Sequence, residues 1–290
     1  MIMHKNFILI AAFLMLQSSF LFAQWPGAGR VDFKTMPSKI LNEEREFAIF
    51  LPRDYDKNTG KSYPVLYLLH GGGGSHKDWP TRAHLADVAN QLITSEEACE
   101  MIIVCPEAGK TFMNYFNSEG WNYEDYFFTE LIPFIEKNYR VIADKKHRAV
   151  AGLSMGGGGT VGYATRHPEM FCAAYPMSAY LYHQKEIPWL NNGNPATEKI
   201  HQVLEKYHGV KQIQNADAAT VEKLKTVKWF IDCGDDDFTF TPNMELVAAL
   251  REKQIPYQLR VRDGGHDWEY WHSALYIALP FVSNQFGKTD

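Results

Sequence analysis

The stretch HRAVAGLSMGGGG, from His147 to Gly159, decides how this chain is expected to fold. Its centre places Ser154 between Gly152 and Gly156 in a G-x-S-x-G pattern. Such a match arises by accident in roughly one chain of this length in ten, because glycine and serine are both common residues. The segments on either side of the pattern therefore have to decide what Ser154 does.

A strand is expected directly before Ser154 and a helix directly after it. RAVAGL is a short apolar run, and the segment that follows reads as a helix ending before Pro168. A nucleophile elbow needs this strand–turn–helix context, with glycines where side chains would collide with the strained turn. We predict that Ser154 is a nucleophile. The helix N-terminus would direct its amides, beginning with Met155, at a developing oxyanion.

The rest of the chain alternates short β-rich runs with longer helical stretches. This alternation predicts an α/β fold with a mostly parallel central sheet of about eight strands and helices on both faces. Strands are expected at 45–52, 64–70, 101–106, 147–153, 172–178, 227–233 and 257–262. Helices are expected at 81–98, 123–139, 154–167, 242–253 and 270–285. The polar segment 181–226 interrupts the rhythm and predicts either a lid over a site or an ordinary surface insertion.

The N-terminus reads as a targeting segment. Residues 1–23 contain one lysine, then an apolar run from Phe7 to Leu16, then small residues around Ala23. This order is typical of a secretory signal peptide cleaved near Ala23, and the run is short for an uncleaved membrane anchor. Residues 24–290 are then expected to form a single domain of a secreted or periplasmic protein without stable membrane insertion.

Composition narrows the ligands and partners. The formal net charge of -5 gives no reason to expect a nucleic acid partner. The acidic run DCGDDD, residues 232–237, lacks the spaced ligands and final Glu of a calcium loop, and we expect no metal or cofactor. No two cysteines have C-x-x-C spacing, and we expect buried free thiols at Cys99, Cys105, Cys172 and Cys233.

A nucleophilic serine needs a base, and in this arrangement the base follows a late strand. His266 fits best, because it comes after the last expected strand through a Gly-Gly turn that lets the loop bend back over the sheet edge. The less suitable histidines are one within the next helix and three in the polar insertion, namely His272, His183, His201 and His208.

An acid is expected to hold the base in place. Asp235, Asp236 and Asp237 follow the strand expected at 227–233, whereas Asp232 lies within that strand and is a poor candidate. A second oxyanion donor is expected after an earlier strand. YLLHGGGGSHKDW, residues 67–79, ends its strand in a His-Gly-Gly run, and we predict that the amide of Gly72 is this donor.

Together these motifs resemble a known family. The stretches YPVLYLLHGGGGSHKDW, YEDYFFTELIPFIEKNYR, HRAVAGLSMGGGG, DCGDDD and GGHDWEYW are similar to the esterase D-like, feruloyl esterase branch of the α/β-hydrolase fold, the carbohydrate esterase family 1 type. The resemblance runs from about Lys39 to the C-terminus. It implies hydrolysis through an acyl-enzyme, with Ser154 as nucleophile and His266 as base. It also implies Asp237 as the acid, the third residue after the strand-ending Gly234.

The resemblance and the expected export together suggest a substrate class. We expect an exported serine carboxylesterase acting on feruloyl or acetyl esters of plant cell-wall polysaccharide such as xylan, with Trp121, Trp189 and Trp268 as candidate substrate contacts. The alternatives are a siderophore or short-chain aryl esterase and an S-formylglutathione hydrolase-like thioesterase, which export disfavours. A catalytically silent carbohydrate-binding domain is a further alternative.

Overall fold

The structure is a computed structural model that describes residues 28–109, 115–182 and 195–288. The expected signal peptide, residues 1–23, and the candidate substrate contact Trp189 lie outside the described residues.

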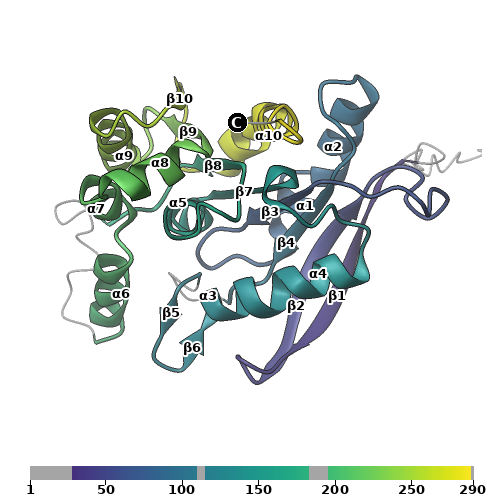
Figure 1. Cartoon of the computed structure of the whole chain (residues 1–290), viewed down its shortest axis with the longest axis horizontal. Helices are drawn as coiled ribbons and strands as arrows, with labels where there is room; N and C mark the ends of the chain where they lie inside the picture. The colour runs from purple at the N-terminus through teal and green to yellow at the C-terminus, as the bar shows by residue number, and fades with distance from the viewer. Residues whose placement is uncertain (1–27, 110–114, 183–194, 289–290) are drawn as a thin grey trace, which may run out of the picture.

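An eight-stranded sheet runs through the molecule (Figure 1), in the order β1-β2-β4-β3-β7-β8-β9-β10. β2 pairs with β1 and β4 in antiparallel fashion, and every later pair in this order is parallel. The strands are β1 (Arg30–Ser38), β2 (Glu43–Leu51), β3 (Val65–Leu69), β4 (Ile102–Pro106), β7 (Arg148–Leu153), β8 (Ala173–Met177), β9 (Lys228–Gly234) and β10 (Tyr257–Arg262); β5 (Asn117–Ser118) and β6 (Trp121–Asn122) form a separate hairpin. The predicted α/β fold with a mostly parallel sheet is confirmed.

β1 is the strand of the central sheet that was not predicted from the sequence. It pairs with β2 along its whole length, but lies at the sheet edge and keeps most of its side chains in contact with water. Its polar residues therefore give no apolar run that would mark it as a strand.

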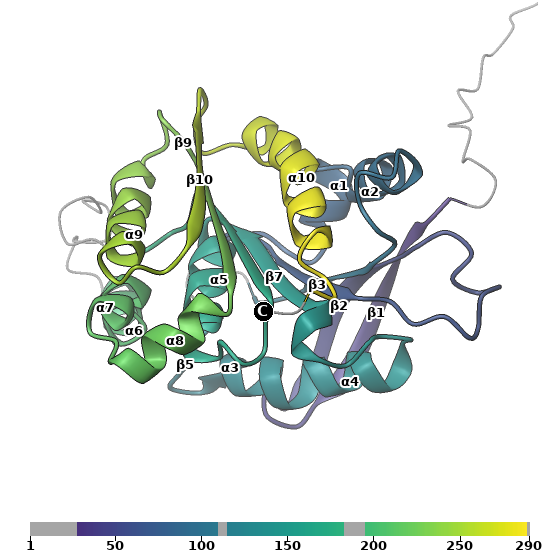
Figure 2. The same ribbon diagram turned by 45° about the horizontal axis from the view of Figure 1, so that its top comes forward.

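Helices cover both faces of the sheet (Figures 1 and 2). One face carries α1 (Asp78–Arg82), α2 (Leu85–Thr94) and α10 (Trp268–Ser283). The other carries α3 (Tyr123–Tyr126), α4 (Ile132–Asn138), α5 (Met155–Arg166), α7 (Gly209–Gln214), α8 (Ala218–Lys225) and α9 (Phe240–Glu252), and α6 (Pro195–Lys206) adds Leu204 to the same core.

The interior strands are apolar on both sides because each face of the sheet has its own core. In β3, Leu66 and Leu68 pack beneath α1, α2 and α10, whereas Val65, Tyr67 and Leu69 pack against the opposite layer. This division follows from the two-residue repeat of a strand. All five side chains are buried, and β3, β4, β7 and β8 are placed with their carboxyl ends at one edge of the sheet.

Two helix predictions need correction. The segment 81–98 forms two helices, because the chain turns at His84, where φ is 49°. The segment 123–139 contains a π-helical turn, Phe127–Leu131, between α3 and α4.

In the insertion predicted at 181–226, α7 and α8 bury Val210, Ile213, Val221 and Leu224 against the main core. Residues 183–194 of that insertion lie outside the described residues.

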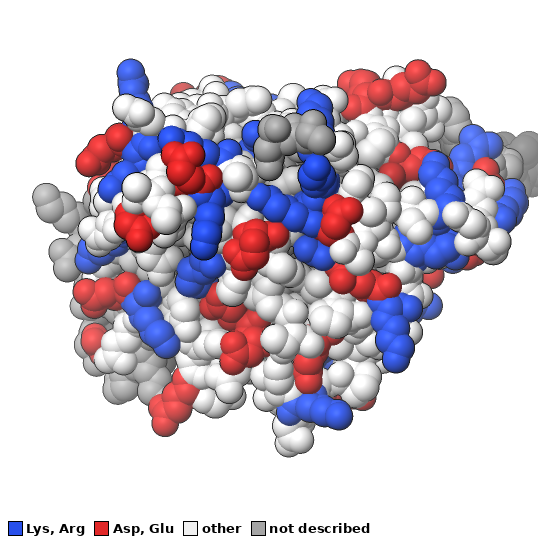
Figure 3. Space-filling model, in the orientation of Figure 1, with Lys and Arg blue, Asp and Glu red and all other residues white. Residues whose placement is uncertain are grey.

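All four cysteines are free, as expected, and three are buried. Cys99 is exposed, which corrects the expectation of a buried thiol: it follows the turn after α2 and donates its N–H to Ser283 Oγ at 2.7 Å. On the face drawn in Figure 3, Lys and Arg side chains are interspersed with Asp and Glu. Among the described residues, no helix combines the length and the apolar character needed to cross a membrane.

Candidate active site

Ser154 occupies a strained turn between β7 and α5. Its backbone has φ 52° and ψ -116°, a conformation that residues with a side chain rarely adopt. The turn is fixed by the Ser154 N–H, which donates to the Met177 carbonyl at 2.9 Å, and by the Ser154 carbonyl, which accepts from Tyr180 N–H at 2.8 Å. A β-carbon at Gly152 would lie 2.5 Å from the Gly156 oxygen, and only glycine fits there. This geometry is that of a nucleophile elbow.

His266 reaches Ser154 from the loop after β10. Its Nε2 lies 2.8 Å from Ser154 Oγ, and its Nδ1 lies 2.9 Å from each carboxylate oxygen of Asp237. Because a carboxylate only accepts, the proton resides on Nδ1, and Nε2 is left to accept the hydroxyl proton. The three side chains therefore form one hydrogen-bonded line from Asp237 through His266 to Ser154.

Asp237 is held as a buried carboxylate. Thr239 donates to its Oδ1 twice, from the backbone N–H at 2.8 Å and from Oγ1 at 2.7 Å. Burial by itself raises the pKa of Asp237, but hydrogen bonds from His266, Thr239 and Ser178 outweigh it and lower the pKa below the usual value. Asp237 therefore stays ionised and keeps its charge beside His266.

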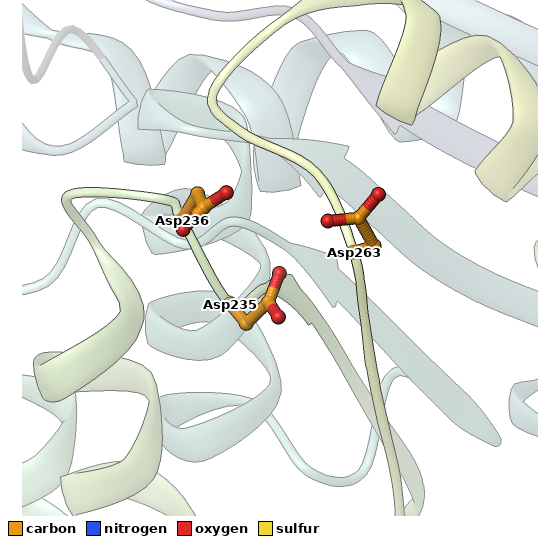
Figure 4. A group of neighbouring side chains, drawn as sticks. All are labelled: Asp235, Asp236 and Asp263. Atoms are coloured by element: carbon orange, nitrogen blue, oxygen red, sulfur yellow. The ribbon is translucent and has the colours of Figure 1, made fainter.

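The neighbouring aspartates lie differently. Asp235 and Asp236 are exposed, and they join Asp263 in a group whose carboxylate oxygens lie within 4.8 Å of one another (Figure 4). Asp235 Oδ1 accepts the N–H of Gly264 at 3.2 Å, which ties the turn after β9 to the loop that carries His266. Of the three candidate acids, only Asp237 contacts His266 in the described structure.

Gly72, the predicted oxyanion donor, lies in the glycine loop after β3. His70 is fully buried, and its Nδ1 donates to the Gly71 carbonyl at 2.8 Å while its Nε2 accepts from Ala108 N–H at 3.0 Å. Burial lowers the pKa of His70, which favours this neutral form. A trans peptide points its carbonyl and its N–H in opposite directions. By fixing the Gly71 carbonyl inward, His70 turns the Gly72 N–H outward.

The N–H of Met155 is the other predicted oxyanion donor. It is the first residue of α5, so its N–H has no acceptor within the helix. Gly72 lies in the lining of the cleft that contains Ser154. The elbow that contains Ser154 follows β7, and the glycine loop follows β3. Because these two strands pair in parallel, the elbow and the loop lie at the same edge of the sheet.

A cleft of about 760 Å³ contains Ser154 and His266. Its walls are the glycine loop 71–74 and four aromatic side chains, Tyr180, Phe238, Trp268 and Trp271. Trp268 is the predicted substrate contact that does line the cleft, with the guanidinium of Arg82 stacked 4.7 Å from its ring. Phe238 is half exposed and lies 4.4 Å from the His266 ring.

Trp121 is not part of this cleft, which corrects the expectation that it contacts substrate there. It lies on β6, stacks on Tyr123 at 5.8 Å and has Arg45 over its ring at 5.0 Å. It is partly buried and packs against the core, because a large aromatic ring gains most from burial. Sequence reasoning missed Phe238, although it directly follows the predicted acid Asp237.

Two of the other candidate histidines, His272 and His208, have structural contacts. His272 Nδ1 lies 2.9 Å from the Ala83 carbonyl, between α10 and the end of α1. His208 precedes α7 and accepts the N–H of Lys211. His183 lies outside the described residues.

Comparison with known proteins gives consistent results. The model of a family described as "Putative esterase" matches residues 38–282. A solved ferulic acid esterase is 48% identical, with a TM-score of 0.85 over 89% of this chain and 99% of that one. An endo-1,4-beta-xylanase/feruloyl esterase of Xylanibacter ruminicola is 36% identical over 55% of this chain, which spans only 23% of that protein. An acetyl esterase of Caldicellulosiruptor saccharolyticus is 26% identical over 85% of this chain and 95% of its own.

Proposed function

This chain belongs to the esterase family, in the feruloyl esterase branch of the α/β-hydrolases, and is a carboxylic ester hydrolase; from this premise we propose that Ser154, His266 and Asp237 are its catalytic triad and that it hydrolyses feruloyl or acetyl esters of plant cell-wall polysaccharide. The observation that carries the proposal is the hydrogen-bonded line from Asp237 through His266 to Ser154 at the cleft.

Acylation follows from this geometry. Ser154 Oγ attacks the ester carbonyl carbon while its proton passes to His266 Nε2. The carbonyl oxygen becomes an oxyanion that accepts hydrogen bonds from the N–H groups of Gly72 and Met155. His266 then protonates the leaving alcohol oxygen, the C–O bond breaks, and an acyl-Ser154 ester remains. Asp237 stabilises the imidazolium during both proton transfers.

Deacylation repeats the steps with water. His266 Nε2 takes a proton from a water molecule as its oxygen attacks the acyl carbon, and the same two amides hold the oxyanion. Collapse of this intermediate releases the carboxylic acid and returns the proton to Ser154 Oγ. The chemistry uses side chains and amides of this chain throughout.

The cleft walls support a flat acyl group. Trp268, Trp271 and Phe238 present ring surface beside the nucleophile, and a hydroxycinnamoyl ring gains from packing against such surface. A volume of about 760 Å³ is much larger than an acetyl group needs. Similarity to a ferulic acid esterase supports the feruloyl reading, and similarity to an acetyl esterase keeps acetyl esters as a second candidate.

Export is a part of this proposal, because polysaccharide substrates lie outside the cytoplasm. The N-terminal sequence supports it through the charged, apolar and small-residue order of residues 1–23. The mass of the mature protein recovered from a periplasmic or culture fraction tests it. A chain that keeps residues 1–23 and stays in the cytoplasm would contradict export.

The function is tested by ester hydrolysis with purified protein. Ser154→Ala is expected to lower kcat on p-nitrophenyl acetate by about 10⁶-fold. Ser95→Ala, a surface serine at the end of α2, is the control and should keep parent activity. Methyl ferulate and acetylated xylan then compare the two acyl groups. Equal rates for Ser154→Ala and the parent would refute the triad, and background rates on both natural-type esters would refute the cell-wall substrate.

A further inference from the structure

Asp232 is a fully buried carboxylate that the proposed chemistry does not use. It lies in β9, five residues before Asp237. Its Oδ1 accepts from Tyr270 OH at 2.6 Å and from Arg260 Nε at 3.2 Å. Its Oδ2 accepts from Tyr175 OH at 2.6 Å and from Arg260 Nη2 at 2.6 Å.

These four hydrogen bonds join four elements of the fold. Tyr175 comes from β8, Arg260 from β10 and Tyr270 from the first turn of α10. A buried charge is costly unless it is paired and hydrogen-bonded, and here the bidentate Arg260 and the two phenols satisfy both oxygens of Asp232. Such a satisfied network holds its members in one arrangement.

Tyr270 connects this network to the two loops of the site. A β-carbon at Gly264 would lie 2.6 Å from Tyr270 Cδ2, and one at Gly234 would lie 3.3 Å from Tyr270 Cε2. The ring therefore packs against the backbone two residues before His266 and three residues before Asp237. Arg262 covers the ring, with its guanidinium carbon 3.6 Å from the ring centre.

The loops also bond to each other across the Tyr270 ring. The N–H of Asp236 donates to the Gly264 carbonyl at 3.2 Å, and Asp235 N–H donates to the Arg262 carbonyl at 3.1 Å. Any shift of the ring would therefore move the turn that carries Asp237 and the loop that carries His266.

The same residue is linked to the nucleophile. The Asp232 carbonyl accepts the N–H of Ser178 at 2.7 Å, just after β8, and the preceding Met177 carbonyl accepts the N–H of Ser154. Ser178 is buried with φ 44°, a strained conformation for a residue with a side chain. Asp232 is thus bonded to segments that lead to all three proposed catalytic side chains.

We propose that Asp232, acting through Tyr270, is a positioning residue that fixes the His266 loop against the Asp237 turn. The proposal rests on the triad assigned above. Asp232 touches neither substrate nor the reacting atoms, so its contribution is the alignment of His266 between Asp237 and Ser154. Misplacement of a catalytic group by about 1 Å costs up to about 10²-fold in rate.

The test compares two substitutions that each remove one phenol from the same carboxylate. Tyr270→Phe removes a 2.6 Å hydrogen bond from the ring that contacts both loops, and Tyr175→Phe removes a 2.6 Å hydrogen bond from a ring that packs on Phe230 and Phe281. Both should lower the melting temperature. Tyr270→Phe should also lower kcat on p-nitrophenyl acetate at least about tenfold with KM nearly unchanged, and Tyr175→Phe should lower kcat far less.

A double-mutant comparison separates positioning from general loosening. If Tyr270 acts by aligning His266 with Asp237, Tyr270→Phe should cost much less in an Asp237→Asn background than in the parent. The same-helix control is Tyr276→Phe, whose hydroxyl bonds to Gln91 and which should leave kcat unchanged.

The outcomes are distinct. The proposal would be overturned if Tyr270→Phe lowered the melting temperature but lowered kcat no more than Tyr175→Phe does. It would also be overturned if Tyr270→Phe lowered kcat by the same factor in the Asp237→Asn background as in the parent. If Tyr270→Phe fails to fold, the more conservative comparison is Arg260→Lys, which keeps the charge and loses the bidentate contact; normal kcat in a folded Arg260→Lys would also overturn it. Activity that survives Ser154→Ala would instead refute the triad itself.

Discussion

Asp237 holds His266 through both carboxylate oxygens, each 2.9 Å from Nδ1, and the buried side chain of Asp237 has no solvent exposure of its own. This contact leaves Nε2 free to accept from Ser154 Oγ.

Asp237→Asn should lower kcat by about 10⁴-fold, because an amide can donate to Nδ1 and favour the wrong imidazole tautomer. Asp236→Asn removes an exposed carboxylate that does not contact His266 and should keep kcat within about twofold. Steady-state kinetics on p-nitrophenyl acetate measures both. A larger loss for Asp236→Asn would move the role of the acid by one residue.

His70→Phe should lower kcat by about 10- to 100-fold while KM changes little. The substitution removes one of two donors to the Gly71 carbonyl and leaves only the Gly74 N–H at 3.2 Å, so the Gly72 N–H is held less firmly toward the oxyanion. Complete loss of one oxyanion donor costs about 10²- to 10³-fold. His272→Phe is the control, since His272 bonds to the Ala83 carbonyl away from the cleft. A kcat loss confined to His272→Phe would contradict the oxyanion role of His70 and the choice of His266.

Trp268→Ala should raise KM for methyl ferulate about three- to tenfold and leave KM for ethyl acetate nearly unchanged, because only the aromatic acyl group gains from the ring. Trp121→Ala is the matched control, a tryptophan that packs outside the cleft. The comparison needs both esters with both variants. Equal KM effects of Trp268→Ala on the two esters would argue against a ring contact.

Protonation of Glu107 should lower the stability of the protein in acid. Burial raises the pKa of Glu107, but the side-chain hydrogen bond from His76, the electrostatic interaction with His70 and the N–H donors of His76 and Gly109 outweigh it. Together they lower the pKa to about 2 in the folded protein, against 4.5 ordinarily. The stability from this carboxylate is therefore present above about pH 4.5 and is lost as the pH falls toward 2.

Urea unfolding of the parent and of Glu107→Gln at several pH values measures this effect. The difference in free energy of unfolding between the two proteins should stay constant above about pH 5 and shrink between pH 4.5 and 2. Glu97→Gln, which removes an exposed carboxylate in the turn after α2, is measured alongside as the control. A difference that does not change with pH for Glu107→Gln would refute the assignment.

Much of the fold could be predicted because interior strands are recognisable from their apolar sequences. β3, β4, β7 and β8 are buried on both faces, so their sequences are continuous apolar runs with turn residues at the ends. β1 could not be found this way, since an edge strand facing water has polar residues along it. The break between α1 and α2 at His84 could not be predicted either, because the residues on both sides favour a helix.

The candidate site divides in the same way. Ser154 and His266 stand beside glycines that the elbow and the final loop require, and these local patterns were sufficient to select them. Trp121 and Trp268 look alike in the sequence, and only the fold separates a ring on the hairpin β5–β6 from a ring in the cleft. Asp232 was set aside because it lies within a strand, and its network with Tyr175, Arg260 and Tyr270 exists only once β8, β9, β10 and α10 are assembled.

The sequence by itself determined the strand–Ser154–helix segment and the positions of the buried strands, because each depends on neighbours within a few residues of the chain. The alternation of these strands with helices along the chain was sufficient to predict a mostly parallel sheet. Only the tertiary structure decided which of three adjacent aspartates faces His266, how His70 directs the Gly72 amide, and which aromatic rings line the cleft. The physical reason is that these arrangements depend on segments far apart in the chain, such as Asp237 and His266, 29 residues apart, and His70 and Ala108, 38 residues apart. Their approach is set by the packing of the whole sheet and its helices.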